Sequence, residues 1–220
     1  MKLVYLLFFA FNIASAQEFN ADLSYKYMNA NKWDNAIQTY NFSRPFLEEK
    51  QPLLIHGINT SISYIFKSPK TIQHGINISY SYFKSAAENE NLNNILNLHF
   101  INLGYIIHYE NNEKTKGLYT ELIMSTLSSG LFRKINGEPF EYKENSSNAF
   151  GIGGDIGLKI GYHLKSKNNM YLSPFMMIAY TPFLYSPFSE ELLNQTNGLT
   201  SEKWAGILTT QIGLTFHVRK

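Results

Sequence analysis

Three histidines, His108, His163 and His217, occupy similar positions within three separate segments of the sequence. Each lies near one end of a segment in which apolar and polar residues alternate, and each falls on the polar side of the alternation. Imidazoles gathered at one level of a structure can bind a transition metal. However, the three segments are not consecutive, and no carboxylate is clearly placed to orient the rings. We therefore interpret the three histidines as polar residues that line a water-filled opening at one end of the structure. We expect no metal and no cofactor.

Three charged residues, Glu121, Asp155 and Lys159, lie on the polar faces of the same kind of segment. Charges that are removed from water need partners, because an unpaired buried charge is costly. We expect these side chains to form a network of ion pairs and hydrogen bonds that fills the interior. A path for protons or ions through the interior is the alternative.

A nucleophilic enzyme would need a serine with a base within hydrogen-bond reach. Serines such as Ser128, Ser129 and Ser186 occur toward the opposite ends of these segments, where His56 and His99 are the available histidines. No hydrolase motif frames any of them. The sequence therefore assigns no catalytic residue and favours a protein that is not an enzyme. A hydrolase or transferase that modifies lipid A or phospholipid stays an alternative.

The elements that position these residues are strands, because the alternation has a period of two. Residues 94–109 change phase near Phe100 and Ile101, which predicts a β-bulge, and residues 170–181 are apolar on both faces. The segments are longer than ordinary strands, as strands that cross a membrane must be. Seven segments show the pattern: 58–66, 72–82, 94–109, 118–127, 150–164, 170–181 and 204–218.

The connections between these segments alternate between short and long, and most charged residues lie in them. Short periplasmic turns and long extracellular loops are typical of outer-membrane barrels. With both termini on the periplasmic side the strand number is even, so an eighth strand must precede residue 50. Residues 35–42 are favoured over residues 20–28, because they leave a shorter loop to the next strand. The long loops 128–148 and 182–203 carry aromatic residues that could bind a surface ligand.

Aromatic residues cluster at both ends of the predicted strands, mostly on the apolar face. Two aromatic belts at the membrane–water interfaces are expected of a barrel in a bilayer. A soluble, exported, lipocalin-like binding barrel is the alternative, in which the apolar face would point inward. The predicted interface residues are Tyr64, Phe66, Tyr80, Tyr82, Tyr105, Tyr109, Tyr162, Trp204 and Phe216.

The N-terminus has the three parts of a secretory signal peptide. Lys2 is followed by an apolar run from Leu3 to Ile13, and the small residues Ala14, Ser15 and Ala16 precede the predicted cleavage site. Two regions are therefore expected: a signal peptide at 1–16 and one domain at 17–220. The apolar run is too short to be a membrane anchor.

The composition agrees with an exported barrel. Of 220 residues only 16% are charged and 15% are aromatic, the net charge is +2, and there is no cysteine. Disorder requires a more polar and more charged chain, and so small a net charge does not imply nucleic acid as a partner. A mean hydropathy of -0.22 excludes a helical membrane protein, whereas strands that alternate apolar and polar faces average to such a value.

Taken together, these residues and patterns resemble small outer-membrane β-barrel proteins of Gram-negative bacteria, of the OmpA/OmpX-like class and the Bacteroidota type. The last strand of such barrels carries an assembly signal, and the resemblance assigns this role to Gln211, Gly213, Phe216 and Val218, although Arg219 and Lys220 follow where many members end on an aromatic residue. It implies an all-β, eight-stranded antiparallel up-and-down transmembrane barrel that resides as a monomer in the bacterial outer membrane. Its partners would be membrane lipid and the barrel-assembly machinery, and its role structural or surface interaction.

Overall fold

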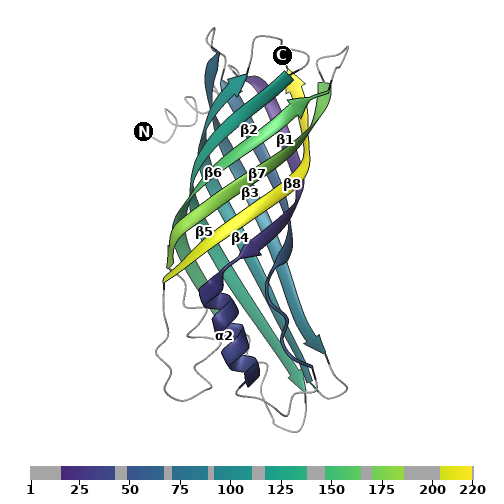
Figure 1. Ribbon diagram of the computed structural model, residues 1–220, viewed down its shortest axis with the longest axis vertical. Helices are drawn as coiled ribbons and strands as arrows, with labels where there is room; N and C mark the ends of the chain where they lie inside the picture. The colour runs from purple at the N-terminus through teal and green to yellow at the C-terminus, as the bar shows by residue number, and fades with distance from the viewer. Residues whose placement is uncertain are drawn as a thin grey trace, which may run out of the picture.

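The computed structural model describes residues 16–42, 49–66, 71–88, 92–110, 117–137, 147–164, 170–185 and 204–219. Within them the chain forms a closed barrel in which every strand pairs antiparallel with its sequence neighbours and β8 pairs back onto β1 (Figure 1). The predicted fold class is therefore confirmed. Most of the predicted signal peptide, 1–16, lies outside the described residues. The elements are β1 (Ala16–Asn29), α2 (Asn31–Phe42), β2 (His56–Phe66), β3 (Ile72–Glu88), β4 (Leu92–Glu110), β5 (Gly117–Gly137), β6 (Ser147–His163), β7 (Met170–Tyr185) and β8 (Trp204–Arg219).

The start of β1 and the end of β8 lie together at one end of the barrel, and α2 lies at the other (Figure 1). By the loop asymmetry described above, the first is the periplasmic end and the second the external end. Strands β3, β4 and β5 extend beyond the others at the external end, beside α2. No helix in the described part of the chain is long and apolar enough to cross a membrane.

The position of the first strand corrects the favoured prediction. Residues 35–42 belong to α2, and the first strand is β1, which includes the less favoured range 20–28. The helix has a signal in the sequence, because its buried residues Trp33, Ala36, Ile37 and Tyr40 are spaced three and four apart. This helical spacing is short, and it stands beside segments that all follow a period of two.

The predicted β-bulge near Phe100 is also wrong. Strand β4 pairs with β3 and with β5 in an unbroken register through this region. The apolar residues nevertheless change sides: Ile101 and Leu103 face outward, whereas Leu98 and Phe100 face inward and are buried. The cause is a change in the surroundings of the strand. Toward the periplasm the outer face meets lipid, and at the external end the inner face meets α2.

Three strands extend further than the sequence predicts. Strand β3 continues to Glu88, β5 to Gly137 and β7 to Tyr185, so much of the predicted loop 128–148 and the start of loop 182–203 are strand. The structure also resolves the faces of β7, which the sequence left ambiguous. Tyr171, Phe175 and Ala179 face inward, and Leu172 and Met176 face outward.

Candidate functional site

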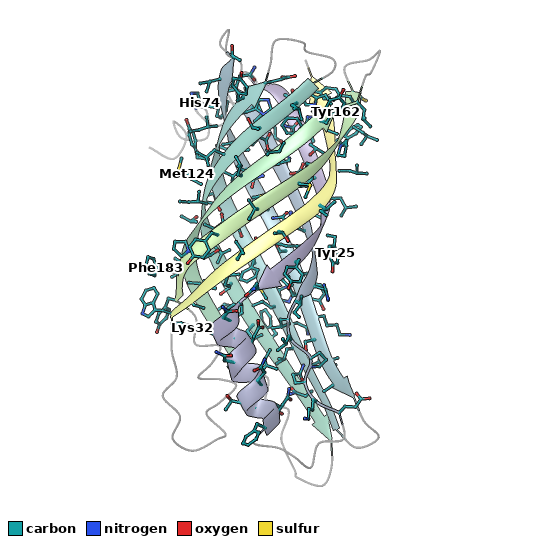
Figure 2. The ribbon with its side chains drawn as sticks, in the orientation of Figure 1. Tyr25, Lys32, His74, Met124, Tyr162 and Phe183 are labelled. Carbon is teal, nitrogen blue, oxygen red and sulfur yellow. The ribbon has the colours of Figure 1, made fainter. Side chains whose placement is uncertain are left out.

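The outer wall of the barrel is apolar across its middle (Figure 2, where Met124 is labelled). Large apolar side chains on all eight strands project outward and are strongly exposed. A closed barrel satisfies all its strand hydrogen bonds internally, so such a wall is suited to hydrocarbon. The molecule is thus an integral membrane barrel of the outer-membrane type, and the lipocalin-like arrangement is excluded. Examples are Leu23, Ile62, Ile78, Leu103, Leu122, Ile156, Met176 and Ile212, each between 37% and 65% exposed.

The predicted interface aromatics lie on this outer wall. Six of them are exposed: Tyr80, Tyr105, Tyr109, Tyr162, Trp204 and Phe216. The other three are partly exposed: Tyr64, Phe66 and Tyr82. Figure 2 shows Tyr162 near the periplasmic end.

Three tyrosines of the wall hydrogen bond a histidine of the neighbouring strand. Tyr80 binds His99 at 2.6 Å, Tyr105 binds His74 at 2.6 Å, and Tyr25 contacts His56. His56 and His99 are the histidines that an external catalytic site would use. Their partners are therefore phenols on the lipid-facing wall. Ser129 is buried on the inner face, Ser128 is exposed, and Ser186 lies outside the described residues.

Lys159 is at the centre of the interior network. Its Nζ lies 2.9 Å from Asp22 Oδ1 and 3.4 Å from Glu121 Oε2, and its side chain is 1% exposed. The ammonium also lies over the ring of Phe175, 4.4 Å from the centroid. The two carboxylates come from β1 and β5, so one lysine on β6 ties three strands together across the interior. This buried charge is compensated, as stability requires.

Asp155 lies in a second polar group, four residues from Lys159 along β6 toward the external end. It accepts hydrogen bonds from Ser125 at 2.7 Å and from Asn102 at 3.2 Å. Lys26, also buried, donates to Ser81 at 3.0 Å. An internal cavity of about 20 Å³ borders these side chains, which is room for a single water. The interior is filled at this level, and Glu121, Asp155 and Lys159 all face it.

The three histidines lie at the periplasmic end of the interior, and all are buried. The structure supplies carboxylates that the sequence could not place. His108 Nδ1 lies 3.0 Å from Glu121, His163 Nε2 lies 3.2 Å from Glu110, and His217 Nδ1 lies 2.6 Å from Glu18.

The histidine rings also pack around aromatic rings. Tyr119 stacks on His163 at 4.5 Å between ring centroids, and Tyr171 stacks on His217 at 4.4 Å. Among the described residues, no group of three or more potential ligands has the arrangement needed to hold a metal ion. The cluster instead closes the periplasmic mouth with paired and stacked side chains.

At the external end, α2 fills the mouth of the barrel. Trp33, Ile37 and Tyr40 are buried against inward-facing apolar residues of the strands, and the ring of Trp33 stacks on Phe100 at 6.3 Å. Burial raises the pKa of the Asp34 carboxyl in the first turn, and a hydrogen bond from the backbone of Ala30 opposes that rise. We call α2 and the apolar inner faces that it covers the external cap; the strand residues include Phe83, Leu96, Leu98, Phe100, Leu127, Leu131, Leu184 and Ile207.

The predicted assembly-signal residues have structural roles in the folded barrel. Gln211 faces inward and accepts a hydrogen bond from Ser24 at 3.1 Å. Gly213 faces Ser24 on β1, and a Cβ at this position would lie 2.4 Å from the carbonyl oxygen of Leu23. Phe216 is exposed on the outer wall and Val218 is partly exposed. Gly213 thus permits the close approach of the strands that close the barrel.

Comparisons with known proteins agree with this fold. No protein-family model and no curated protein sequence matches the chain. Among solved structures, Neisserial surface protein A has a TM-score of 0.50 and 10% sequence identity, covering 92% of this chain and 96% of that chain. The attachment invasion locus protein of Yersinia pestis has a TM-score of 0.46 and 10% identity, covering 91% and 97%. The N-terminal barrel of OprF from Pseudomonas aeruginosa has a TM-score of 0.42 and 10% identity, covering 92% and 98%. At this identity the first similarity supports the fold alone, and the predicted resemblance is confirmed at that level.

Proposed function

We propose that the protein acts at the cell surface through its external end, and that its barrel is a filled stem rather than a pore. The observation that carries this proposal is the interior, which side chains close at three levels. The histidine cluster closes the periplasmic mouth, the Lys159 network occupies the middle, and the external cap fills the opposite end. An eight-stranded barrel is just wide enough for side chains to fill it.

The external end also has the features of an interaction platform. Strands β3, β4 and β5 extend beyond the rest of the barrel, and the external cap gives them an apolar core of their own. Phe132 is 37% exposed on this extension. Of the other loop aromatics, Phe183 and Tyr185 lie on β7, and Phe140, Tyr142 and Phe188 lie outside the described residues. The connections 138–146 and 186–203 are the candidate binding segments.

Conductance across a planar bilayer tests the filled stem. Purified protein inserted into the bilayer should give no steady current above that of the lipid alone, because Lys159 and the side chains that contact it occupy the middle of the interior. A known open porin in the same bilayer is the positive control. A stable, ohmic current from the protein would overturn the filled stem and favour the ion path.

The absence of cysteine allows a direct test of orientation. Asn145→Cys places one thiol in the connection 138–146, and Ser166→Cys places one in the connection 165–169. A membrane-impermeant maleimide should label the first variant on intact cells and the second only after the outer membrane is permeabilised. The reverse pattern would contradict the assigned orientation.

Loop replacement tests the interaction role. Exchanging 138–146 and 186–203 for Gly-Ser linkers of equal length should abolish capture of a surface partner in a pull-down while the barrel still folds. Unchanged capture would contradict this role. Mass spectrometry of lipid A, with and without the gene, tests the enzyme alternative, for which we expect no difference.

A further inference from the structure

The seam where β7, β8 and β1 meet is incomplete at the external end. β1 pairs with β8 only as far as Asn29 opposite Leu208, whereas β8 begins at Trp204. Beyond that pair the chain enters α2, which contacts β8 in place of a strand. The first residues of β8 therefore have no strand on their β1 side.

The pairing of β8 with β7 is interrupted at the same level. The register shifts between Thr181 and Leu184, so Pro182 and Phe183 of β7 lie opposite the single residue Gly206 of β8. Proline has no backbone N–H and glycine has no side chain, so neither the ladder nor a β8 side chain closes the wall here. The bulge turns Phe183 outward, where it is 69% exposed.

A groove of about 520 Å³ opens to the outside along this seam. Tyr180, Phe183, Trp204 and Leu208 form apolar walls, and Gly206 lies between them. Lys32, in the first turn of α2, is exposed at the rim of the groove. Figure 2 shows Lys32 and Phe183 on the same side of the barrel near its external end.

The location of the groove indicates its occupant. Trp204 and Tyr180 are exposed rings in the external parts of their strands. Aromatic belts meet lipid headgroups at this level of a barrel. Apolar walls open toward the hydrocarbon suit an acyl chain, and a lysine at the headgroup level attracts an anionic phosphate. We propose that the groove binds one phosphorylated lipid of the outer leaflet, with an acyl chain against Phe183 and Leu208 and the phosphate at Lys32. This binding is independent of a surface partner, so either proposal can fail alone.

The two tryptophans of the chain make the test direct. Trp33 is buried in the external cap, whereas Trp204 lines the groove. Trp33→Phe leaves Trp204 as the single reporter. Detergent-solubilised protein is titrated with phosphatidic acid that carries brominated acyl chains, which quench tryptophan on contact. We expect quenching that saturates at one lipid per protein, and brominated diacylglycerol, which lacks the phosphate, should bind about fivefold more weakly.

Two substitutions separate the acyl and phosphate contacts. Gly206→Leu fills the groove, and the site tolerates a Cβ because its nearest neighbour would be Tyr180 Oη at 3.4 Å; we expect at least tenfold weaker binding of both lipids. Lys32→Gln should weaken phosphatidic acid about fivefold and leave diacylglycerol unchanged. The matched controls are Thr210→Leu, an exposed outward position on β8 that does not line the groove, and Lys84→Gln, an exposed lysine on β3. Neither control should alter binding.

Several outcomes would overturn the proposal. Quenching that does not saturate means bulk contact with lipid rather than a site, and wild-type affinity in Gly206→Leu means that the groove is not the site. Equal binding of phosphatidic acid and diacylglycerol would contradict the proposed contact between the phosphate and Lys32. Concentration-dependent dimers that cross-link through position 204 would assign the groove to a second copy of the chain. Native mass spectrometry of the unsubstituted chain, which should retain one phosphatidic acid, guards against a folding defect in the Trp33→Phe background.

Discussion

At the scale of single residues, buried charged side chains in the interior pair with one another. Lys159 is the clearest case, because its ammonium is shared by Asp22 and Glu121 and is almost completely buried. Removing one member of such a group leaves the others charged and unpaired in a medium of low polarity. The free-energy cost of a substitution here should therefore depend on which charged groups are left unpaired, rather than on the contacts of the side chain that is removed.

Replacing Lys159 with methionine tests that dependence. We expect Lys159→Met to destabilise the folded barrel by about 3–5 kcal/mol, because two carboxylates then lose their cation. Urea unfolding in lipid vesicles, followed by tryptophan fluorescence, measures the loss. The triple variant Lys159→Met, Asp22→Asn, Glu121→Gln should recover most of it. A single variant as stable as the wild type would show that the network is not important for stability.

Gly213 gives a second prediction at this scale. A methyl group there would lie 2.4 Å from the Leu23 carbonyl oxygen and 2.5 Å from Ser24 Cβ. Gly213→Ala should therefore push β1 and β8 apart and cost about 1–3 kcal/mol. Gly206→Ala on the same strand is the control and should be nearly neutral. Refolding into vesicles without assembly machinery measures the structural effect, and normal refolding of Gly213→Ala would leave the assembly signal as its only role.

At the scale of elements, the external ends of the strands show an inversion. Strand β4 carries apolar residues on its outer face toward the periplasmic end and on its inner face toward the external end, with no break in register. Helix α2 is the element that makes this possible, because it supplies the apolar surface on which the inner faces pack. We therefore expect the boundary of the membrane to lie where the apolar side of β4 changes, between Phe100 and Ile101.

A pair of lysine substitutions on β4 tests this boundary. Leu103→Lys places a charge on the outer wall within the apolar belt, where we expect a cost of about 2–4 kcal/mol. Ile95→Lys, on the same outward face beyond the boundary, should cost about 0–1 kcal/mol. Unfolding in vesicles of defined thickness measures both. Equal costs would show that the outer face of the external extension also contacts lipid.

At the scale of the whole molecule, closure of the barrel determines its behaviour. Among the described residues, β8 pairs with β1 and closes the ladder. At the external end, the seam and the part of β3 beyond Phe83 lack a neighbouring strand on one side. In a bilayer or a detergent shell, no water competes for these backbone hydrogen bonds, and they are lost together.

Heat-modifiable migration follows from this closure. Without boiling, the protein should remain a folded barrel in sodium dodecyl sulfate and should migrate differently from the boiled, unfolded chain. Gel electrophoresis with and without heating measures the shift, and the same gel serves as the folding check for every variant above. Identical migration, together with recovery in the soluble periplasmic fraction, would contradict a membrane barrel.

Much of the fold follows from the sequence. The period of two, the aromatic ends of the strands and the alternating loop lengths together determine a membrane barrel, because each face of a strand has a single environment over most of its length. The same rule places Glu121, Asp155 and Lys159 on the inward faces, and all three side chains are buried. Local pattern is sufficient wherever the environment is uniform.

Tertiary structure decided the remainder, where the environment changes along an element. Residues 35–42 form a helix because their apolar side chains pack on the inner faces of other strands, at Phe83, Leu98 and Phe100. The partners of the three histidines are carboxylates from distant parts of the chain, which only closure of the barrel brings together. The seam with its groove exists because β1 ends opposite Leu208 and so leaves the first residues of β8 without a partner on that side. This mismatch is between strands at opposite ends of the sequence. Local periodicity carries no information on such pairings, since they depend on the register of the closed barrel.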